Sequence, residues 1–190
     1  MLLSTPVGPL GTGIGGGVEL TIANLAKILT QVGHRVTVVT PAGANLSVLT
    51  LPDDDIDVVQ IPGELQPPAQ TQSRSAPAVT SSVLSNMWDY AHQVQLQYDL
   101  LVNFAYDWLP FCLTSIFSVP IAHFVSMGSL SDRLDRLIAS ISARYPHAIG
   151  AYSQSQVNTF GHLDPGVGWE ILGCGLDIRK YDYCDRPDKS

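Results

Sequence analysis

Apolar residues recur along this chain at two spacings, and segments of the two kinds alternate. Residues 18–32 repeat apolar side chains every three or four positions, which predicts a helix that a glycine at position 33 ends. Residues 35–40 (RVTVVT) are β-branched and precede a proline, which predicts a short strand. Two leucines at positions 2 and 3 predict the stub of an opening strand, giving a right-handed βαβ unit. The buried helix face is expected to hold Val18, Ile22, Leu25, Ala26 and Leu29.

The rest of the chain continues this alternation. Short apolar runs predict strands at residues 48–51, 58–61, 100–104, 121–125, 147–152 and 169–172. Helical spacing predicts helices at residues 83–98, 109–117, 131–145 and 153–160. Ser131 is expected to cap the third of these helices and Pro146 to end it. The pattern predicts the α/β class, with a single Rossmann-like, doubly wound, mostly parallel sheet.

Charge and composition narrow the function classes. Only 14% of the residues are charged, and the net charge is −7. Because binding to nucleic acid or to an anionic membrane needs clustered Lys and Arg, both partners are disfavoured. The chain opens without a signal peptide, and no apolar run reaches about 18 residues, so a cytoplasmic protein is expected.

The cysteines and two polar segments carry further expectations. Cys112, Cys174 and Cys184 lack a metal-ligand spacing and are expected to be free thiols, with Cys112 in the core. No metal site is predicted. The acidic residues between 53 and 57 predict a solvated turn. Residues 62–77 are rich in Pro, Gln and Ser and predict a mobile loop, and one hypothesis makes this loop a lid over a bound acceptor.

A glycine-rich loop between the first strand and the first helix is the most informative motif. Backbone amides there, together with the helix N-terminus, favour a phosphate group, although the glycines could simply make a flexible loop. Gly11, Gly13 and Gly16 match the dinucleotide pattern GxGxxG, but the loop is too long for a tight Rossmann turn. The second strand ends in Thr40 rather than an acid, which argues against a nucleotide-binding oxidoreductase module.

Several motifs, in order, resemble family 4 glycosyltransferases. The chain carries GGGVE at 15–19, NLA at 24–26, GH at 33–34 and VTVVTP at 36–41. It continues with YDLL at 98–101, DW at 107–108 and ILGCGLD at 171–177. The resemblance implies the N-terminal, acceptor-side half of a two-domain GT-B fold, with a domain at residues 1–178. Residues 179–190 would then begin a linker to a missing C-terminal donor domain.

The same resemblance implies a function. The whole protein would transfer a sugar from a nucleotide sugar, UDP-glucose by expectation, to an acceptor hydroxyl with retention of configuration. It would need no cofactor beyond this co-substrate. The amides of Gly15, Gly16 and Gly17 would approach the donor diphosphate. Because the donor-binding cations and acidic motif of the family lie in the C-terminal domain, this chain alone is expected to be inactive.

Six residues are candidates for binding the acceptor. Asn103, Tyr106 and Ser126 stand at or near positions where the family often carries histidines, which indicates specialised acceptor chemistry. Each of the other three could instead have a purely structural role. Glu19 could stabilise the helix dipole, Asp107 could cap a helix, and His123 could be a hydrogen-bonded core residue. The complete set is Glu19, Asn103, Tyr106, Asp107, His123 and Ser126.

One more resemblance suggests the identity of the acceptor. Residues 4–21 are similar to those of cyanobacterial pterin glucosyltransferases, which implies tetrahydrobiopterin as the acceptor and UDP-glucose as the donor. The alternatives are a lipid or polysaccharide glycosyltransferase half, a nucleotide-binding oxidoreductase module, and a non-catalytic binding module. A basic amphipathic face would favour the lipid enzyme. The acceptor, the sugar and the oligomeric state stay open at this level.

Overall fold

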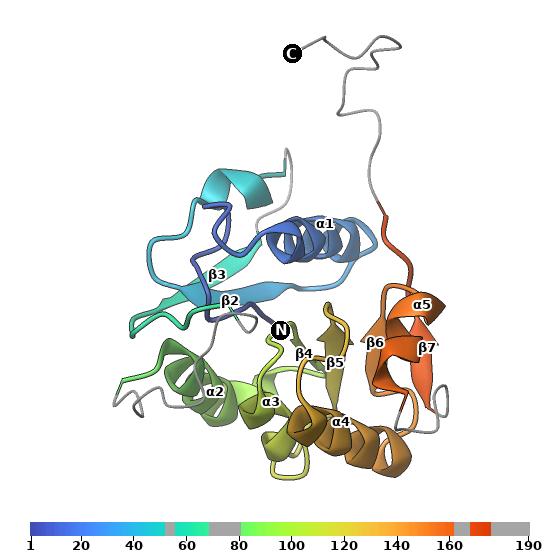
Figure 1. Ribbon diagram of the computed structural model, residues 1–190. Helices are drawn as coiled ribbons and strands as arrows, with labels where there is room; N and C mark the ends of the chain where they lie inside the picture. Colours follow the sequence, from blue (N-terminus) through green and yellow to red (C-terminus); the bar gives the residue numbers. More distant parts are fainter. Residues whose placement is uncertain (52–55, 69–80, 162–167, 176–190) are drawn as a thin grey trace, which may run out of the picture.

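A single parallel sheet forms the centre of the computed structural model, which describes residues 1–51, 56–68, 81–161 and 168–175 (Figure 1). All pairings between its named strands are parallel, so the predicted doubly wound sheet is confirmed, as wholly rather than mostly parallel. In spatial order the strands are β3 (Asp57–Ile61), β2 (Thr37–Pro41), β1 (Leu2–Leu3), β4 (Leu101–Asn103), β5 (Ile121–Val125), β6 (Ile149–Ala151) and β7 (Trp169–Ile171).

Helices cover both faces of the sheet. Helix α1 lies over one face, and α2, α3 and α4 lie along the other, while α5 follows β6 (Figure 1). Short 3₁₀ turns join these elements, three of them within the described residues. The helices are α1 (Gly17–Gln31), α2 (Val83–Val94), α3 (Trp108–Leu113), α4 (Asp132–Arg144) and α5 (Gln154–Val157), and the turns are η1 (Leu46–Leu49), η3 (Gln95–Gln97) and η4 (Asn158–Phe160).

The two-residue strand β1 contributes to both layers of the core. Because successive strand side chains point to opposite faces, Leu2 packs on the α1 side and Leu3 on the α2 side. Both leucines are at most 2% exposed. Burial of such a side chain stabilises the fold by about 1.5–3 kcal/mol. The short strand is therefore held from both faces as well as by its two neighbours.

Most of the predicted elements are present, with shorter bounds. In α1, Ile22 and Ala26 are buried, and Gly33 has φ of 93° just after the C-cap, the left-handed conformation expected of a helix-ending glycine. Strand β5 has the predicted bounds. Helix α4 begins after Ser131, although the Ser131 side chain makes no capping hydrogen bond. Helix α3 ends at Leu113, short of the predicted residue 117.

Two predictions are wrong. Residues 48–51 do not form a strand; the Asn45 side chain accepts a hydrogen bond from the Ser47 amide at 3.2 Å and starts the turn η1 instead. Cys112 is exposed rather than in the core. Pro110 and Phe111 are the buried residues of α3, and the next position on a helix points about 100° away from Phe111.

The polar loop after β3 is anchored where the structure describes it. The Gln66 amide donates to the Pro6 carbonyl at 2.9 Å, and its side chain donates to Ser82 Oγ at 3.1 Å. The remainder of the predicted loop, the acidic residues 53–55, Cys184 and the linker at 179–190 lie outside the described residues. Among the helices that the structure describes, none is long and apolar enough to cross a membrane.

Candidate functional site

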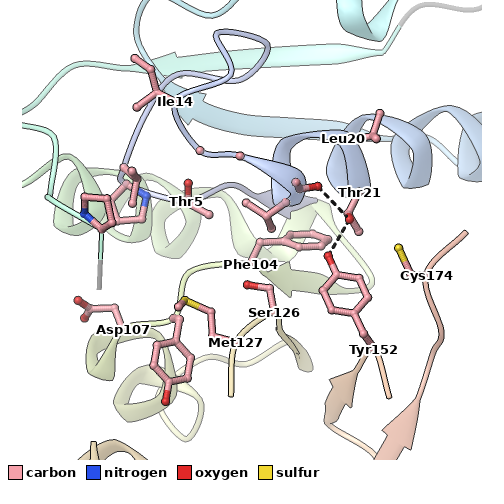
Figure 2. Close-up of a pocket in the computed structure, with 18 of the residues that line it drawn as sticks. Thr5, Ile14, Leu20, Thr21, Phe104, Asp107, Ser126, Met127, Tyr152 and Cys174 are labelled. Atoms are coloured by element: carbon pink, nitrogen blue, oxygen red, sulfur yellow. Dashed lines mark hydrogen bonds between the residues drawn. The ribbon is translucent and has the colours of Figure 1, made fainter. Parts of the chain in front are cut away.

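A cavity of about 740 Å³ opens where the carboxyl ends of the strands meet the N-terminus of α1 (Figure 2). The chain leaves β1 toward β2 on one side and reaches β4 on the other, so this is the switch point of the sheet. Ligands of doubly wound sheets bind in the crevice at such a point. The walls come from the loop after β1, the first turns of α1, and the segments that follow β3, β4, β5, β6 and β7.

The glycine loop forms one wall of the cavity, and a side chain of the helix that follows, α1, binds the amides of the loop. The Glu19 carboxylate accepts hydrogen bonds from the amides of Gly11 at 2.7 Å, Gly13 at 3.1 Å and Gly15. Glu19 is 7% exposed and does not line the cavity, whereas Gly15, Gly16 and Gly17 do. Glu19 therefore shapes the loop from behind.

The end of β2 also holds this loop. Thr40 is fully buried, and its Oγ1 accepts a hydrogen bond from the Leu10 amide at 3.0 Å. In dinucleotide-binding folds an acid about 20 residues beyond the glycine motif contacts a ribose. Here Thr40, near the end of β2, faces the protein interior and could not contact a ribose. The structure therefore does not support the oxidoreductase alternative.

Aromatic rings line the wall that adjoins α1. The Phe104 ring lies 5.4 Å from that of Phe124, which lies 4.7 Å from that of Tyr152, and Phe104 and Tyr152 line the cavity. The Tyr152 hydroxyl lies 2.7 Å from Thr21 Oγ1 (Figure 2). Neither Phe104 nor Tyr152 stands out in the sequence, because aromatic residues after a strand are more often packing residues.

Asn103 and His123 lie beneath the cavity rather than in its wall. The Asn103 side chain bonds both the amide and the carbonyl of Ala105 at 3.0 Å, which fixes its orientation so that Nδ2 also donates to His123 Nδ1 at 3.1 Å. His123 Nε2 therefore carries the proton and donates to Thr114 Oγ1 at 2.8 Å. Thr114 in turn donates to the Pro110 carbonyl at 3.2 Å.

Burial keeps His123 neutral. His123 is 1% exposed, its ring stacks on Phe111 with centroids 4.5 Å apart, and burial lowers its pKa to about 3. The geometry fits the core alternative, because both ring nitrogens are occupied inside the protein. Asn103 and His123 support the backbone from which the cavity residues after β4 project.

Tyr106 and Asp107 follow β4 and line the cavity. Asp107 Oδ1 accepts from the Leu109 amide at 2.9 Å, so this residue is the N-cap of α3 as well as part of the wall. Burial raises the pKa of Asp107, and burial raises the pKa of Tyr106 to about 12. The cap fixes the Asp107 carboxylate at the edge of the cavity, where it can accept hydrogen bonds from a ligand.

Ser126 lies in the segment after β5, and a glutamine holds that segment in place. Gln156 Nε2 donates to the carbonyls of Val125 at 2.6 Å and Met127 at 2.8 Å. Gln156 Oε1 accepts from the Tyr152 amide at 2.9 Å. Ser126 and Met127 both line the cavity, so Gln156 couples the ends of β5 and β6 beneath it.

The predicted candidates thus divide into two sets. Gly15, Gly16, Gly17, Tyr106, Asp107 and Ser126 line the cavity, whereas Glu19, Asn103 and His123 lie behind it. Sequence reasoning missed the wall residues Thr5, Thr21, Gln66, Phe104, Met127 and Tyr152. Their one signal is position, since most of them follow a strand or begin a helix at the ligand-binding edge.

The charge of the site limits its chemistry. Of the wall residues that the structure describes, none is Lys, Arg or His, and Asp107 is the sole carboxylate. A search of the described residues finds no group of His, Cys, Asp and Glu side chains arranged to hold a metal ion. A diphosphate in this cavity would meet backbone amides and the α1 N-terminus rather than cationic side chains.

The fold recurs in a solved structure. Anabaena Alr3699/HepE, whose crystal structure is in complex with UDP, matches this chain with a TM-score of 0.60 and 19% sequence identity. The shared feature is the fold. The match covers 97% of this chain and 46% of that chain, so this chain spans about half the length of that protein. No family model matches the sequence, and the search of curated proteins finds no match.

Proposed function

We propose that this chain is the N-terminal, acceptor-side half of a two-domain GT-B glycosyltransferase that takes a sugar from a nucleotide sugar, with retention of configuration. The position of the cavity at the switch point supports this role, because the glycine loop, the α1 N-terminus and four strand ends converge there. The likeness to a UDP-bound structure of about twice the length adds support. The proposed donor is UDP-glucose.

The donor diphosphate is proposed to contact the Gly17 amide and the Gly16 backbone at the start of α1, although the Gly16 amide itself donates to the Gly13 carbonyl at 3.2 Å. The helix dipole places partial positive charge there, and this charge stabilises the leaving diphosphate as negative charge develops on it. Helix N-terminal amides alone supply only about half an elementary charge. Since the described wall contains no cationic side chain, the remaining positive charge has to come from a second domain, and this half alone is inactive.

The acceptor is proposed to lie between the aromatic wall and Asp107, and a reduced pterin fits this chemistry. A pterin is a nearly flat system of two fused rings. One edge carries adjacent N–H donors, and a single carboxylate can accept hydrogen bonds from both. The half-buried Tyr152 ring offers an apolar surface beside the buried Phe104, and the Asp107 carboxylate is the acidic group of the described wall. Ser126 can hydrogen-bond a hydroxyl group of the acceptor side chain, whereas the Tyr106 hydroxyl is buried.

Calorimetric titration of this chain tests the proposal. We expect tetrahydrobiopterin to bind, UDP-glucose to bind weakly or not detectably, and the Asp107→Asn variant to lose at least about tenfold in pterin affinity, or roughly 1.4 kcal/mol. Asp99→Asn is the matched control, because Asp99 is exposed and precedes β4 at the opposite edge of the sheet. Equal pterin affinity of the two variants, or tight binding of UDP-glucose to this chain, contradicts the proposed arrangement.

A lipid acceptor is the second candidate, and two exposed residues favour it. Ile14 and Leu20 line the cavity and are 59% and 41% exposed, so they give its mouth an apolar rim. An acyl chain could lie against this rim. Binding of a short-chain glycolipid that Ile14→Ser abolishes, with no binding of pterin, would select the lipid enzyme over the pterin enzyme.

A further inference from the structure

We propose that Glu19 is a positioning residue. Its carboxylate occupies the amides of the inner half of the glycine loop, residues 11–15, and so restricts ligand phosphates to the outer half, residues 16 and 17. Three amides of the loop, those of Gly11, Gly13 and Gly15, converge on the two carboxylate oxygens. Gly11 and Gly13 have φ of 80° and 81°, the left-handed conformation that turns successive N–H groups toward one concave side. Such a nest of amides binds an anion.

The carboxylate and a phosphate cannot occupy this nest together. Glu19 is buried at 7% exposure, and its three amide partners compensate the cost of removing its charge from water. A phosphate oxygen would need the same N–H groups and would stand next to a negative charge. The inner half of the loop is therefore closed to an external anion as long as Glu19 stays in place.

The free space around the glycines shows where the loop divides. A Cβ added at Gly15 would lie 2.8 Å from a Glu19 carboxylate oxygen, so the absence of a side chain at 15 serves Glu19. A Cβ added at Gly16 or Gly17 would meet no protein atom within 4 Å, and both residues line the cavity. The packing of the described protein gives no reason for the missing side chain at Gly17, whereas a ligand approaching the backbone there does.

Under the proposed function, on which this step rests, the donor diphosphate meets Gly16 and Gly17 while Glu19 fixes the loop that carries them. Glu19 then acts through the backbone and not by touching the acceptor. Loss of the carboxylate would free three amides, loosen the loop and create a new site for small anions at Gly11, Gly13 and Gly15. This gain of a site is the signature that a merely stabilising residue would not give.

Amide hydrogen exchange measured by NMR on this chain tests the positioning role without reference to transferase activity. We expect Glu19→Gln to speed exchange at Gly11, Gly13 and Gly15 by tenfold or more, because the amide of Gln replaces an acceptor oxygen with a donor. Exchange at residues of β5 should not change. Glu64→Gln is the matched control, since Glu64 is exposed. Unchanged exchange at the three glycines in Glu19→Gln overturns the proposal.

Small anions provide the second readout. In Glu19→Ala, acetate and inorganic phosphate should slow exchange at Gly11, Gly13 and Gly15, and neither should do so in the unaltered chain. Phosphate shifts of these three amides in the unaltered chain would overturn the proposal, as would a folded Glu19→Ala chain that ignores both anions. If Glu19→Ala does not fold, the Glu19→Gln comparison still decides. Failure to bind pterin, or tight binding of UDP-glucose to this chain, would contradict the proposed function and leave these exchange results unaffected.

Discussion

The hydroxyl oxygens of Tyr152 and Thr21 lie 2.7 Å apart and join the end of β6 to the second turn of α1 (Figure 2). Thr21 Oγ1 also donates to the Gly17 carbonyl at 3.3 Å, so the Tyr152 hydroxyl is the donor in the first bond. Both residues line the cavity. This bond links the glycine-loop side of the cavity to its aromatic side without passing through the sheet.

A double-mutant cycle should detect this link. Tyr152→Phe and Thr21→Val each remove one partner and should lower the free energy of unfolding by about 0.5–1.5 kcal/mol. The double variant should cost less than the two single losses together, because the second change removes a bond that is already broken. Urea denaturation gives the three values. Strict additivity would mean that the hydroxyls do not interact.

Acid should destabilise the protein through His123. The unfolded chain binds a proton at this residue near the ordinary pKa of 6.5, whereas the folded chain binds it only near 3. Between these values the unfolded state holds the extra proton, so stability falls as pH falls, by roughly 1.4 kcal/mol per pH unit. Above pH 6.5 this residue contributes no pH dependence.

A variant isolates this contribution from that of the carboxylates. His123→Gln should lower stability at pH 7 by about 1–3 kcal/mol, because buried partners lose hydrogen bonds. Its stability should then fall less steeply than that of the unaltered chain from pH 6.5 downward. Denaturation midpoints between pH 4 and pH 8 measure both curves. Parallel curves for the two chains would show that His123 takes up its proton in the folded state.

Two glycines of one loop should respond oppositely to alanine. Gly11 has φ of 80°, and its added Cβ would lie 2.6 Å from the Asn45 carbonyl oxygen, so Gly11→Ala should destabilise the fold by about 1–3 kcal/mol. Gly17→Ala should be neutral or stabilising by up to about 1 kcal/mol. The expected effect of Gly17→Ala is on ligand binding: it should abolish the NMR shifts that millimolar UDP-glucose causes at Gly16. Unchanged shifts would place the donor elsewhere.

Removal of Gln156 should loosen the cavity from below. Gln156→Ala leaves the Val125 and Met127 carbonyls and the Tyr152 amide without this partner, which should cost about 2–3 kcal/mol of unfolding free energy. Gln154→Ala is the matched control, since Gln154 is exposed and bonds only the Asn158 side chain at 3.0 Å; it should cost under about 0.5 kcal/mol. Thermal unfolding compares the two, and equal losses would contradict the role of Gln156.

Much of the fold is readable from the sequence because buried faces leave a periodic trace. The spacing of Ile22 and Ala26 on α1 and the unbroken apolar run of β5 both identify the correct elements. The prediction for residues 48–51 is wrong because a β-branched and leucine-rich stretch is typical of a strand. It does not reveal that the Asn45 side chain accepts a hydrogen bond that starts a 3₁₀ turn. Cys112 misleads because a six-residue helix is too short to define a buried face by spacing.

The site was predictable as a place but not as a set of contacts. The glycine loop and Asp107 follow strands, and the cavity does open at that edge of the sheet. Whether a polar side chain points into the cavity or beneath it depends on packing from distant segments. His123 faces α3 and Asn103 rather than the cavity, and the Glu19 carboxylate turns back onto the loop before it.

Strand β1 is the third of the seven strands in the sheet and the shortest that the structure describes, and this has a consequence for how the chain folds. Leu2 pairs with Val38 on one side and with Val102 on the other, so the two halves of the sheet are joined only through β1. Contacts separated by on the order of a hundred residues close slowly, because chain entropy opposes them. During synthesis, the half that contains β2 and β3 leaves the ribosome before β4 exists. The two parts of the sheet are therefore joined late, when β4 emerges and β1 gains its second neighbour.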